Sequence, residues 1–183
     1  MSVNRFFLSA LALAALAAAN IRAEETVEVG GAKMYPSKNI VENAMNSKDH
    51  TTLVAAVKAA DLVKTLQGKG PFTVFAPTNQ AFEALPPGTV ETLVKPENKE
   101  KLAKILTYHV VAGNLDAASI QKMAEKNHGV ATLKTVEGGK LEVMEKNGKW
   151  MVKDAKGNTA TITIADVHQS NGVIHVIDAV LMP

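Results

Sequence analysis

The sequence predicts an α+β fold, with helices mostly in the N-terminal part of the chain and a β-meander in the C-terminal part. Two observations support this prediction. Before Gly129, apolar residues recur in several segments at the spacing of amphipathic helices. After Gly129 they alternate with polar residues, and Gly138-Gly139 and Asn147-Gly148 separate the alternating segments as hairpin turns. We therefore expect helices to cover one part of a β-sandwich.

Residues 171–183, Asn-Gly-Val-Ile-His-Val-Ile-Asp-Ala-Val-Leu-Met-Pro, predict a strand that is buried on both faces, because nearly every residue from Val173 on is apolar. Alternation places His175 on one face and Asp178 on the other. We interpret both as hydrogen-bonded core residues, since a buried polar group without a partner costs about 1–3 kcal/mol. The alternative is a proton-transfer or ligand site. Asn171-Gly172 predicts a turn, so the strand should pair antiparallel with the strand before it.

Helical spacing predicts one long helix that opens at Thr52 and ends at Gly68. A short strand follows, and Thr78 is a candidate N-cap of the next helix. In that register Pro77 and Phe82 flank the cap and can pack on each other. A later helix, which begins near residue 97, should turn His109 inward.

Residues 1–23 have the layout of a secretory signal peptide, with Arg5, an apolar run at 6–19 and small residues after it. The apolar run is shorter than the about 20 residues that span a bilayer. Cleavage is predicted after Ala23, with Ala19 as the alternative site. Residues 24–36 show no period and predict a flexible leader, and residues 37–183 form the predicted domain. We expect export, either to the periplasm or to the outside of the cell.

The cysteine content excludes disulfides, and the charge balance argues against nucleic acid and anionic membranes as partners. The chain has no cysteine, so it must fold without disulfides. Loss of residues 1–23 removes two of the 20 basic residues and leaves 18 against 18 acidic ones. A chain with this balance has little electrostatic attraction for nucleic acid or an anionic membrane, and we expect neither partner.

The sequence predicts a binding protein and not an enzyme. It contains no Gly-x-Ser-x-Gly elbow, phosphate loop or His-Glu-x-x-His run. Its five histidines are scattered along the chain: His50, His109, His128, His168 and His175. We therefore expect no catalytic residues, no metal site and no cofactor.

Three motifs in order along the chain resemble those of fasciclin-type domains. Their shared residues are Thr73, Phe75, Pro77, Thr78 and Phe82 in the first motif, Tyr108-His109 in the second, and Asn171, Gly172, His175 and Asp178 in the closing motif. The resemblance covers about residues 37–183. It implies a compact sandwich or wedge of two sheets with several helices, usually in secreted or surface-anchored proteins. It also implies adhesion, by binding to cell-surface or matrix proteins, to glycans, or to another copy of the chain.

The same resemblance suggests where a partner would bind. In animal members an Asp-Ile pair before the closing motif is linked to integrin recognition, and Asp166-Val167 corresponds to it. The Tyr-His pair, here Tyr108-His109, is also linked to adhesion. Trp150 lies beside a predicted turn, and Trp is enriched at interaction hot spots. For each the alternative is structural: a turn or bulge for Asp166, core packing for Tyr108-His109 and closure of the sandwich for Trp150.

A second functional hypothesis is carriage of an apolar small molecule, such as a carotenoid-like pigment. Some fasciclin-type proteins bind such pigments, and helices over a sandwich can leave an apolar cleft. Aromatic residues make up only 4% of the chain, so a stacked aromatic pocket is not expected. Met123, Met144 and Met151 are candidates for an adaptable lining, with core filling as the alternative.

Overall fold

The computed structural model describes residues 26–183, so the predicted signal peptide lies outside the described residues. Its helices are α1 (Ile40–Ala44), α2 (Thr51–Ala59), α3 (Val63–Leu66), α4 (Asn79–Glu83), α5 (Thr89–Leu93), α6 (Lys99–Tyr108) and α7 (Ala117–Lys126), with single 3₁₀ turns η1 (Lys48–His50) and η2 (Pro96–Asn98). Its strands are β1 (Val27–Val29), β2 (Ala32–Met34), β3 (Phe72–Pro77), β4 (Val110–Ala112), β5 (Val130–Lys134), β6 (Lys140–Lys146), β7 (Lys149–Lys153), β8 (Thr159–Gln169) and β9 (Gly172–Ile177). In this part of the chain, no helix has the length and apolar character needed to cross a membrane.

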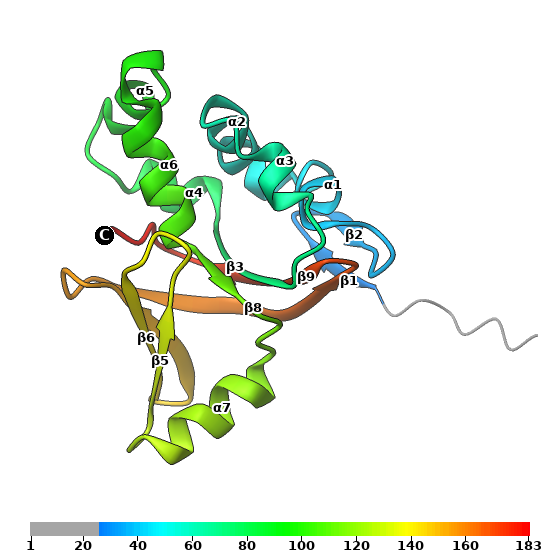
Figure 1. Cartoon of the computed structure of the whole chain (residues 1–183), viewed down its shortest axis with the longest axis vertical. Coiled ribbons are helices and arrows are strands. Elements are labelled where there is room, and N and C mark those ends of the chain that lie inside the picture. Colours follow the sequence, from blue (N-terminus) through cyan, green and yellow to red (C-terminus); the bar gives the residue numbers. More distant parts are fainter. Residues whose placement is uncertain (1–25) are drawn as a thin grey trace, which may run out of the picture.

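Seven strands form one sheet in the order β4-β3-β9-β8-β7-β6-β5. Strands β3 and β9 pair in parallel, and all other neighbours in this sheet pair antiparallel. The first part of β8 pairs with β7 and its last part with β9, with register shifts between them. In Figure 1, β5 and β6 run across the direction of β8. A bridge between Val111 and Thr135 links the two ends of the sheet.

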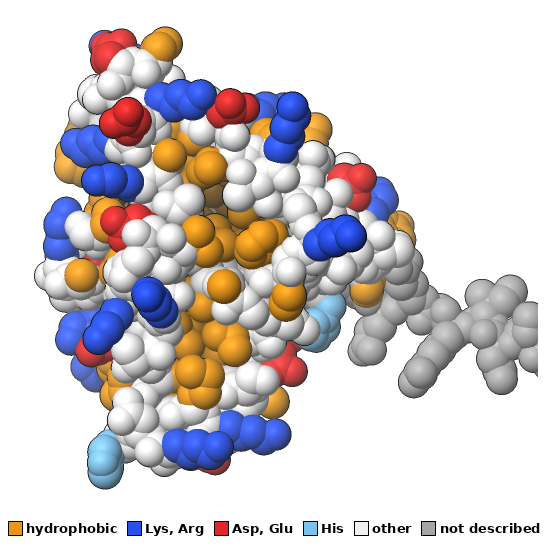
Figure 2. Space-filling model, viewed as in Figure 1, with side chains coloured by type: hydrophobic (Ala, Val, Ile, Leu, Met, Phe, Trp, Pro, Cys, Tyr) orange, Lys and Arg blue, Asp and Glu red, His pale blue; other side chains and the backbone are white. Residues whose placement is uncertain are grey.

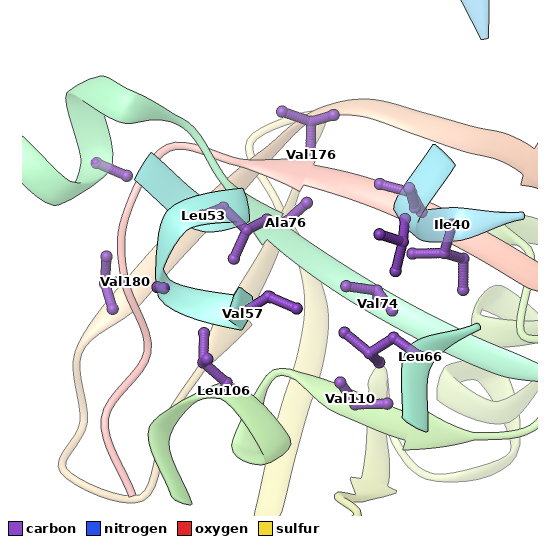
Figure 3. Packing of buried hydrophobic residues seen from close by; sticks show 14 of the residues in the cluster. Ile40, Leu53, Val57, Leu66, Val74, Ala76, Leu106, Val110, Val176 and Val180 are labelled. Atoms are coloured by element: carbon purple, nitrogen blue, oxygen red, sulfur yellow. The ribbon is translucent and has the colours of Figure 1, made fainter. Parts of the chain in front are cut away.

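The central strands β3 and β9 separate two hydrophobic cores. Figure 1 shows α1 to α6 above these strands, and β5, β6 and α7 below them. Val74 and Val176 belong to the core under the helices, which we call the helix-side core (Figure 3). Phe75 and Ile177 belong to the other core, between the meander and α7, which we call the sheet-side core. Alternate residues of one strand thus enter different cores, which is why β9 is buried on both faces.

The predicted α+β class is confirmed, and so is the order of helices first and meander last. The predicted helix cap at Thr78 is also confirmed, since its side chain accepts a hydrogen bond from Ala81 N. Asp116 caps α7 in the same way and accepts a hydrogen bond from Ser119 N. The predicted antiparallel return at Asn171-Gly172 is confirmed by the pairing of β8 with β9.

Three predictions were wrong. Residues 24–36 were expected to be a flexible leader, but their described part forms the β1–β2 hairpin, which buries Val29 and Met34 in the helix-side core. Asp178 was expected to be buried, but β9 ends one residue before it and its exposed carboxylate accepts a hydrogen bond from Thr161 N at 2.6 Å. The long helix expected from Thr52 is divided between α2 and α3 at Asp61, where φ is 59°.

Candidate functional site

An apolar cavity lies in the helix-side core, between α1, α2, α3 and α6 on one side and β3, β4, β8 and β9 on the other. Its volume is about 50 Å³. Figure 3 shows Val57, Leu66, Val74, Leu106 and Val110 pointing toward one another around this space. Figure 2 shows apolar side chains gathered on the surface between α6 and the helices α2 and α3, with a hollow among them.

Few of the lining side chains are polar, and most polar atoms among them already have partners. His109 Nδ1 donates to the carbonyl of Ile105 at 2.8 Å, and His109 Nε2 accepts from Leu181 N at 2.9 Å. Lys58 is exposed at the surface of α2. Ser47 Oγ lies 2.9 Å from His50 Nδ1. The other ring nitrogen of His50, Nε2, is buried and has no hydrogen-bond partner among residues 26–183.

Burial controls the charge of these histidines. It lowers the pKa of His109 from 6.5 to about 4, although the nearby Ile105 carbonyl acts in the opposite direction. Burial also lowers the pKa of His50, opposed by the Ala76 backbone and by Asp49. Both imidazoles are therefore neutral near pH 7, when each ring carries one proton and can accept at its other nitrogen.

Tyr108 and His109, predicted as partner-binding residues, are both buried. The Tyr108 hydroxyl donates to the Lys140 carbonyl at 2.8 Å and accepts from Ala155 N at 2.9 Å. Burial raises the pKa of Tyr108. Because His109 also holds the backbone of Leu181, the pair connects the end of α6 to β6, to the β7–β8 turn and to the C-terminal segment. Neither side chain is open to a partner at the surface.

Asp166 and Val167, the other predicted recognition pair, lie within β8. Val167 is 1% exposed and packs in the helix-side core. Asp166 is partly buried with φ of 56°, and its carboxylate accepts from Ala117 N at 2.7 Å, at the first turn of α7. Its own N–H donates to His175 Nδ1 at 3.3 Å. Asp166 therefore connects β8 to α7 and to β9.

The remaining motif residues hold the central strands. His175 is buried, its Nε2 donates to the Leu115 carbonyl at 2.8 Å, and its ring stacks on Phe75 with 5.6 Å between centroids. Burial lowers the pKa of His175. Thr73 Oγ1 donates to the Gly113 carbonyl at 2.7 Å and accepts from Leu115 N at 2.9 Å. A Cβ atom on Gly172 would lie 1.9 Å from the Phe72 carbonyl oxygen, so only glycine fits there.

Trp150, on β7, is partly exposed and packs against the sheet-side core. Of the predicted contact residues, Trp150 and Asp166 are thus partly exposed, whereas the other three are buried. The three methionines proposed as cleft lining, Met123, Met144 and Met151, are partly buried in α7 and the meander and do not line the cavity.

Sequence reasoning missed three buried polar residues that join distant segments. Asn171 was assigned to a turn, but its side chain also accepts from Ile40 N at 3.0 Å and donates to the carbonyls of Leu66 and Gly68 at 2.8 and 2.9 Å. Asn43 bonds to the backbone of Tyr35 and to the side chain of Gln169. His50 was noted only as one of several scattered histidines. Their sequence neighbours gave no signal of burial, since His50 follows Asp49 and Asn171 follows Ser170.

Helices over one face of a bent, seven-stranded sheet that contains one parallel pair define the class of α+β domain to which this chain belongs. The chain belongs to the Fasciclin domain family, whose model matches residues 48–183. It is 51% identical to Protein sll1483 of Synechocystis sp. over 160 residues, which cover 87% of this chain and 82% of that protein. It is 36% identical to the cell surface glycolipoprotein MPB83 of Mycobacterium bovis over 145 residues, 76% of this chain and 58% of that one.

A solved structure has the same fold. The FAS1 domain pair of the insect cell adhesion molecule Fasciclin I superposes with a TM-score of 0.72 at 18% identity, over 81% of this chain and 52% of that one. One domain of the pair thus corresponds to the described part of this chain.

Proposed function

We propose that this protein is exported and acts by binding, not by catalysis, and that its ligand is an apolar small molecule held in the cavity under α2 and α6. One observation carries the proposal: the cavity is lined almost entirely by aliphatic side chains. The surface between α6 and the helices α2 and α3 is also apolar and hollowed (Figure 2). Ligand sites are typically apolar clefts with a few polar groups that fix orientation. Export is supported by the predicted signal peptide and by the cell-surface relative MPB83.

The size of the cavity sets a condition on binding. A volume of about 50 Å³ admits one or two small groups, whereas drug-sized ligands occupy about 300–1,000 Å³. A long ligand therefore requires the helices over the cavity to move away from the sheet. These helices are short and separate, because α2 and α3 are divided at Asp61 and α3 has four residues. A layer of this kind can shift at its turns without breaking a long helix.

A second candidate function is adhesion to a cell-surface or matrix protein or glycan, or to another copy of the chain. It is favoured by the family, since the solved relative Fasciclin I is a cell adhesion molecule. We retain Trp150 as the contact residue, because it is partly exposed, whereas Tyr108, His109 and Val167 are buried. Asp166 is also partly exposed, but its carboxylate is hydrogen-bonded to Ala117 N. A single domain needs self-association or tethering to join two surfaces.

Native mass spectrometry of the mature protein, isolated gently from its own source, tests these functions. The carrier proposal predicts an added mass that is lost on denaturation. Val57→Phe, which fills the cavity, should lose the added mass, and Met45→Phe, a control at an exposed position outside it, should keep it. Wild-type protein without added mass would contradict the carrier proposal. A ligand-free dimer that Trp150→Ala separates would favour self-association.

A further inference from the structure

We propose that His50 selects the ligand of this cavity: an apolar molecule with a neutral carbonyl or hydroxyl oxygen at one end, which accepts a hydrogen bond from His50 Nε2. This inference rests on the proposed carrier function and names the chemical class of its ligand. It follows from a polar atom that the protein itself leaves without a partner.

His50 lies where the helical layer meets the sheet, at the end of η1 and directly before α2. The residue is 3% exposed and lines the cavity. Among the buried side-chain nitrogen and oxygen atoms of residues 26–183, His50 Nε2 is the one without a hydrogen-bond partner. The backbone of Ala76 lies close enough to the ring to raise the pKa of His50, but its contact with Nε2 does not meet the geometry of a hydrogen bond. An unpaired buried polar atom costs about 1–3 kcal/mol, so a ligand atom that pairs with Nε2 gains affinity.

The partner of the other ring nitrogen indicates that Nε2 carries the proton. Ser47 is also buried, and its hydroxyl is hydrogen-bonded to His50 Nδ1 at 2.9 Å. If Nδ1 carried the proton, the Ser47 hydroxyl hydrogen would have no acceptor among the hydrogen bonds of the described residues. When Ser47 donates to Nδ1, both side chains are satisfied at that contact. His50 then presents an N–H donor at Nε2, and the matching ligand atom is an acceptor.

The other groups around the cavity favour a neutral acceptor over a carboxylate. Both nitrogens of His109 are occupied by Ile105 and Leu181, so this second histidine offers no donor. Lys58 is the positively charged residue among the described lining, and its side chain is exposed. A carboxylate beside the neutral His50 would be buried without a counter-charge, which is costly. A ketone or alcohol oxygen has no such cost.

A matched pair of small probes tests the inference. Cyclohexanone and methylenecyclohexane have nearly the same shape, but only the ketone accepts a hydrogen bond. Binding of each is measured from the NMR methyl signals of Val57 and Leu106, which line the cavity. His50→Leu removes the donor at similar volume, and His50→Gln keeps an amide N–H near the position of Nε2. Differences in the hydration of the two probes cancel when the same pair is compared in two proteins.

We expect His50→Leu to lower the preference for the ketone over the hydrocarbon about fivefold, as the loss of one hydrogen bond implies, and His50→Gln to keep most of it. In wild-type protein, long-range ¹H–¹⁵N spectra should show the His50 proton on Nε2 and a shift of that nitrogen with cyclohexanone alone. This readout needs no variant and holds if a substitution unfolds the domain.

The possible results distinguish an error about the role of His50 from an error about the carrier function. If both probes bind and the preference is the same in wild type and His50→Leu, the role of His50 is wrong and the carrier function stands. A proton on Nδ1 in the wild-type spectra would also overturn the role of His50. If neither probe moves the methyl signals of wild-type protein, the cavity takes no ligand and both proposals are wrong.

Discussion

Acid should destabilise this domain well above the pH at which carboxylates become protonated, because His109 is buried as a neutral ring. Its Nε2 accepts the hydrogen bond of Leu181 N, and protonation of Nε2 removes that acceptor. Burial lowers the pKa of His109 from 6.5 to about 4. As the pH falls below 6.5, the unfolded chain therefore binds the proton first. The stability that neutral His109 provides is present above that pH and is lost progressively toward pH 4.

The size of the effect follows from the two pKa values. A difference of about 2.5 units corresponds to about 3 kcal/mol when fully expressed, of which about 2 kcal/mol is lost between pH 7 and pH 5. The pKa values of His50 and His175 are also lowered by burial, so both add to the loss in the same direction. A total stability of about 5–15 kcal/mol is usual for a domain, which makes this pH dependence easy to measure.

Urea unfolding of wild type and His109→Gln at several pH values provides the assay. The glutamine side chain oxygen can accept from Leu181 N, but the residue does not titrate between pH 7 and pH 4. The variant should be less stable at pH 7 and should lose about 2 kcal/mol less than wild type between pH 7 and pH 5. His168→Gln, the same exchange at an exposed position, is the control. Parallel curves for wild type and His109→Gln would refute the reasoning.

Three further predictions concern the closing motif. Asn171→Ala removes three side-chain hydrogen bonds and should lower the free energy of unfolding in urea by about 2–4 kcal/mol. Asn98→Ala, the control, removes one and should lower it by less than about 1 kcal/mol. Equal losses would contradict the role of Asn171. Gly172→Ala places a methyl group on the Phe72 carbonyl and should prevent folding as judged by circular dichroism; a normally folded variant would show that β3 and β9 are not so close. Asp178→Ala should change the unfolding free energy by less than about 1 kcal/mol, since its one side-chain hydrogen bond is exposed, and a larger loss would restore a core role for this residue.

The sequence predicted where strands form better than it predicted which strands pair with each other. Period-two alternation and Asn-Gly or Gly-Gly turns are local signals, and the meander from β5 to β8 followed them. The parallel pairing of β3 with β9 joins segments about 100 residues apart, and no local pattern encodes it. The structural alternative for Asp166, a turn or bulge, is confirmed as a bulge, because the pairing of β8 with β9 shifts register between Ile164 and Val167. A positive φ within a strand is set by what the strand packs against.

The error at Asp178 has a different origin. Alternation was extended through nine residues because they are apolar on both sides of the aspartate, although the strand ends at Ile177. After that point the chain turns, and hydrophobicity continues because Val180 and Leu181 pack into the two cores from a non-strand segment. An apolar run thus indicated burial of the neighbourhood correctly, but it gave no information about which way one side chain points.

The candidate site shows why the segment before the family match matters. The Fasciclin domain model begins at residue 48, yet Val29, Met34, Ile40 and Ser47 all line the cavity. Val29 and Met34 come from the β1–β2 hairpin, and Ser47 is hydrogen-bonded to His50 Nδ1. The cavity is therefore completed by residues that lie outside the matched segment, whereas the motifs inside it hold the two central strands together. Relatives can share the strands, the Tyr108-His109 contact and the closing motif while their N-terminal segments line this cavity differently. Under our proposal, the ligand would then vary with residues 27–50 and not with the motifs by which the domain is recognised.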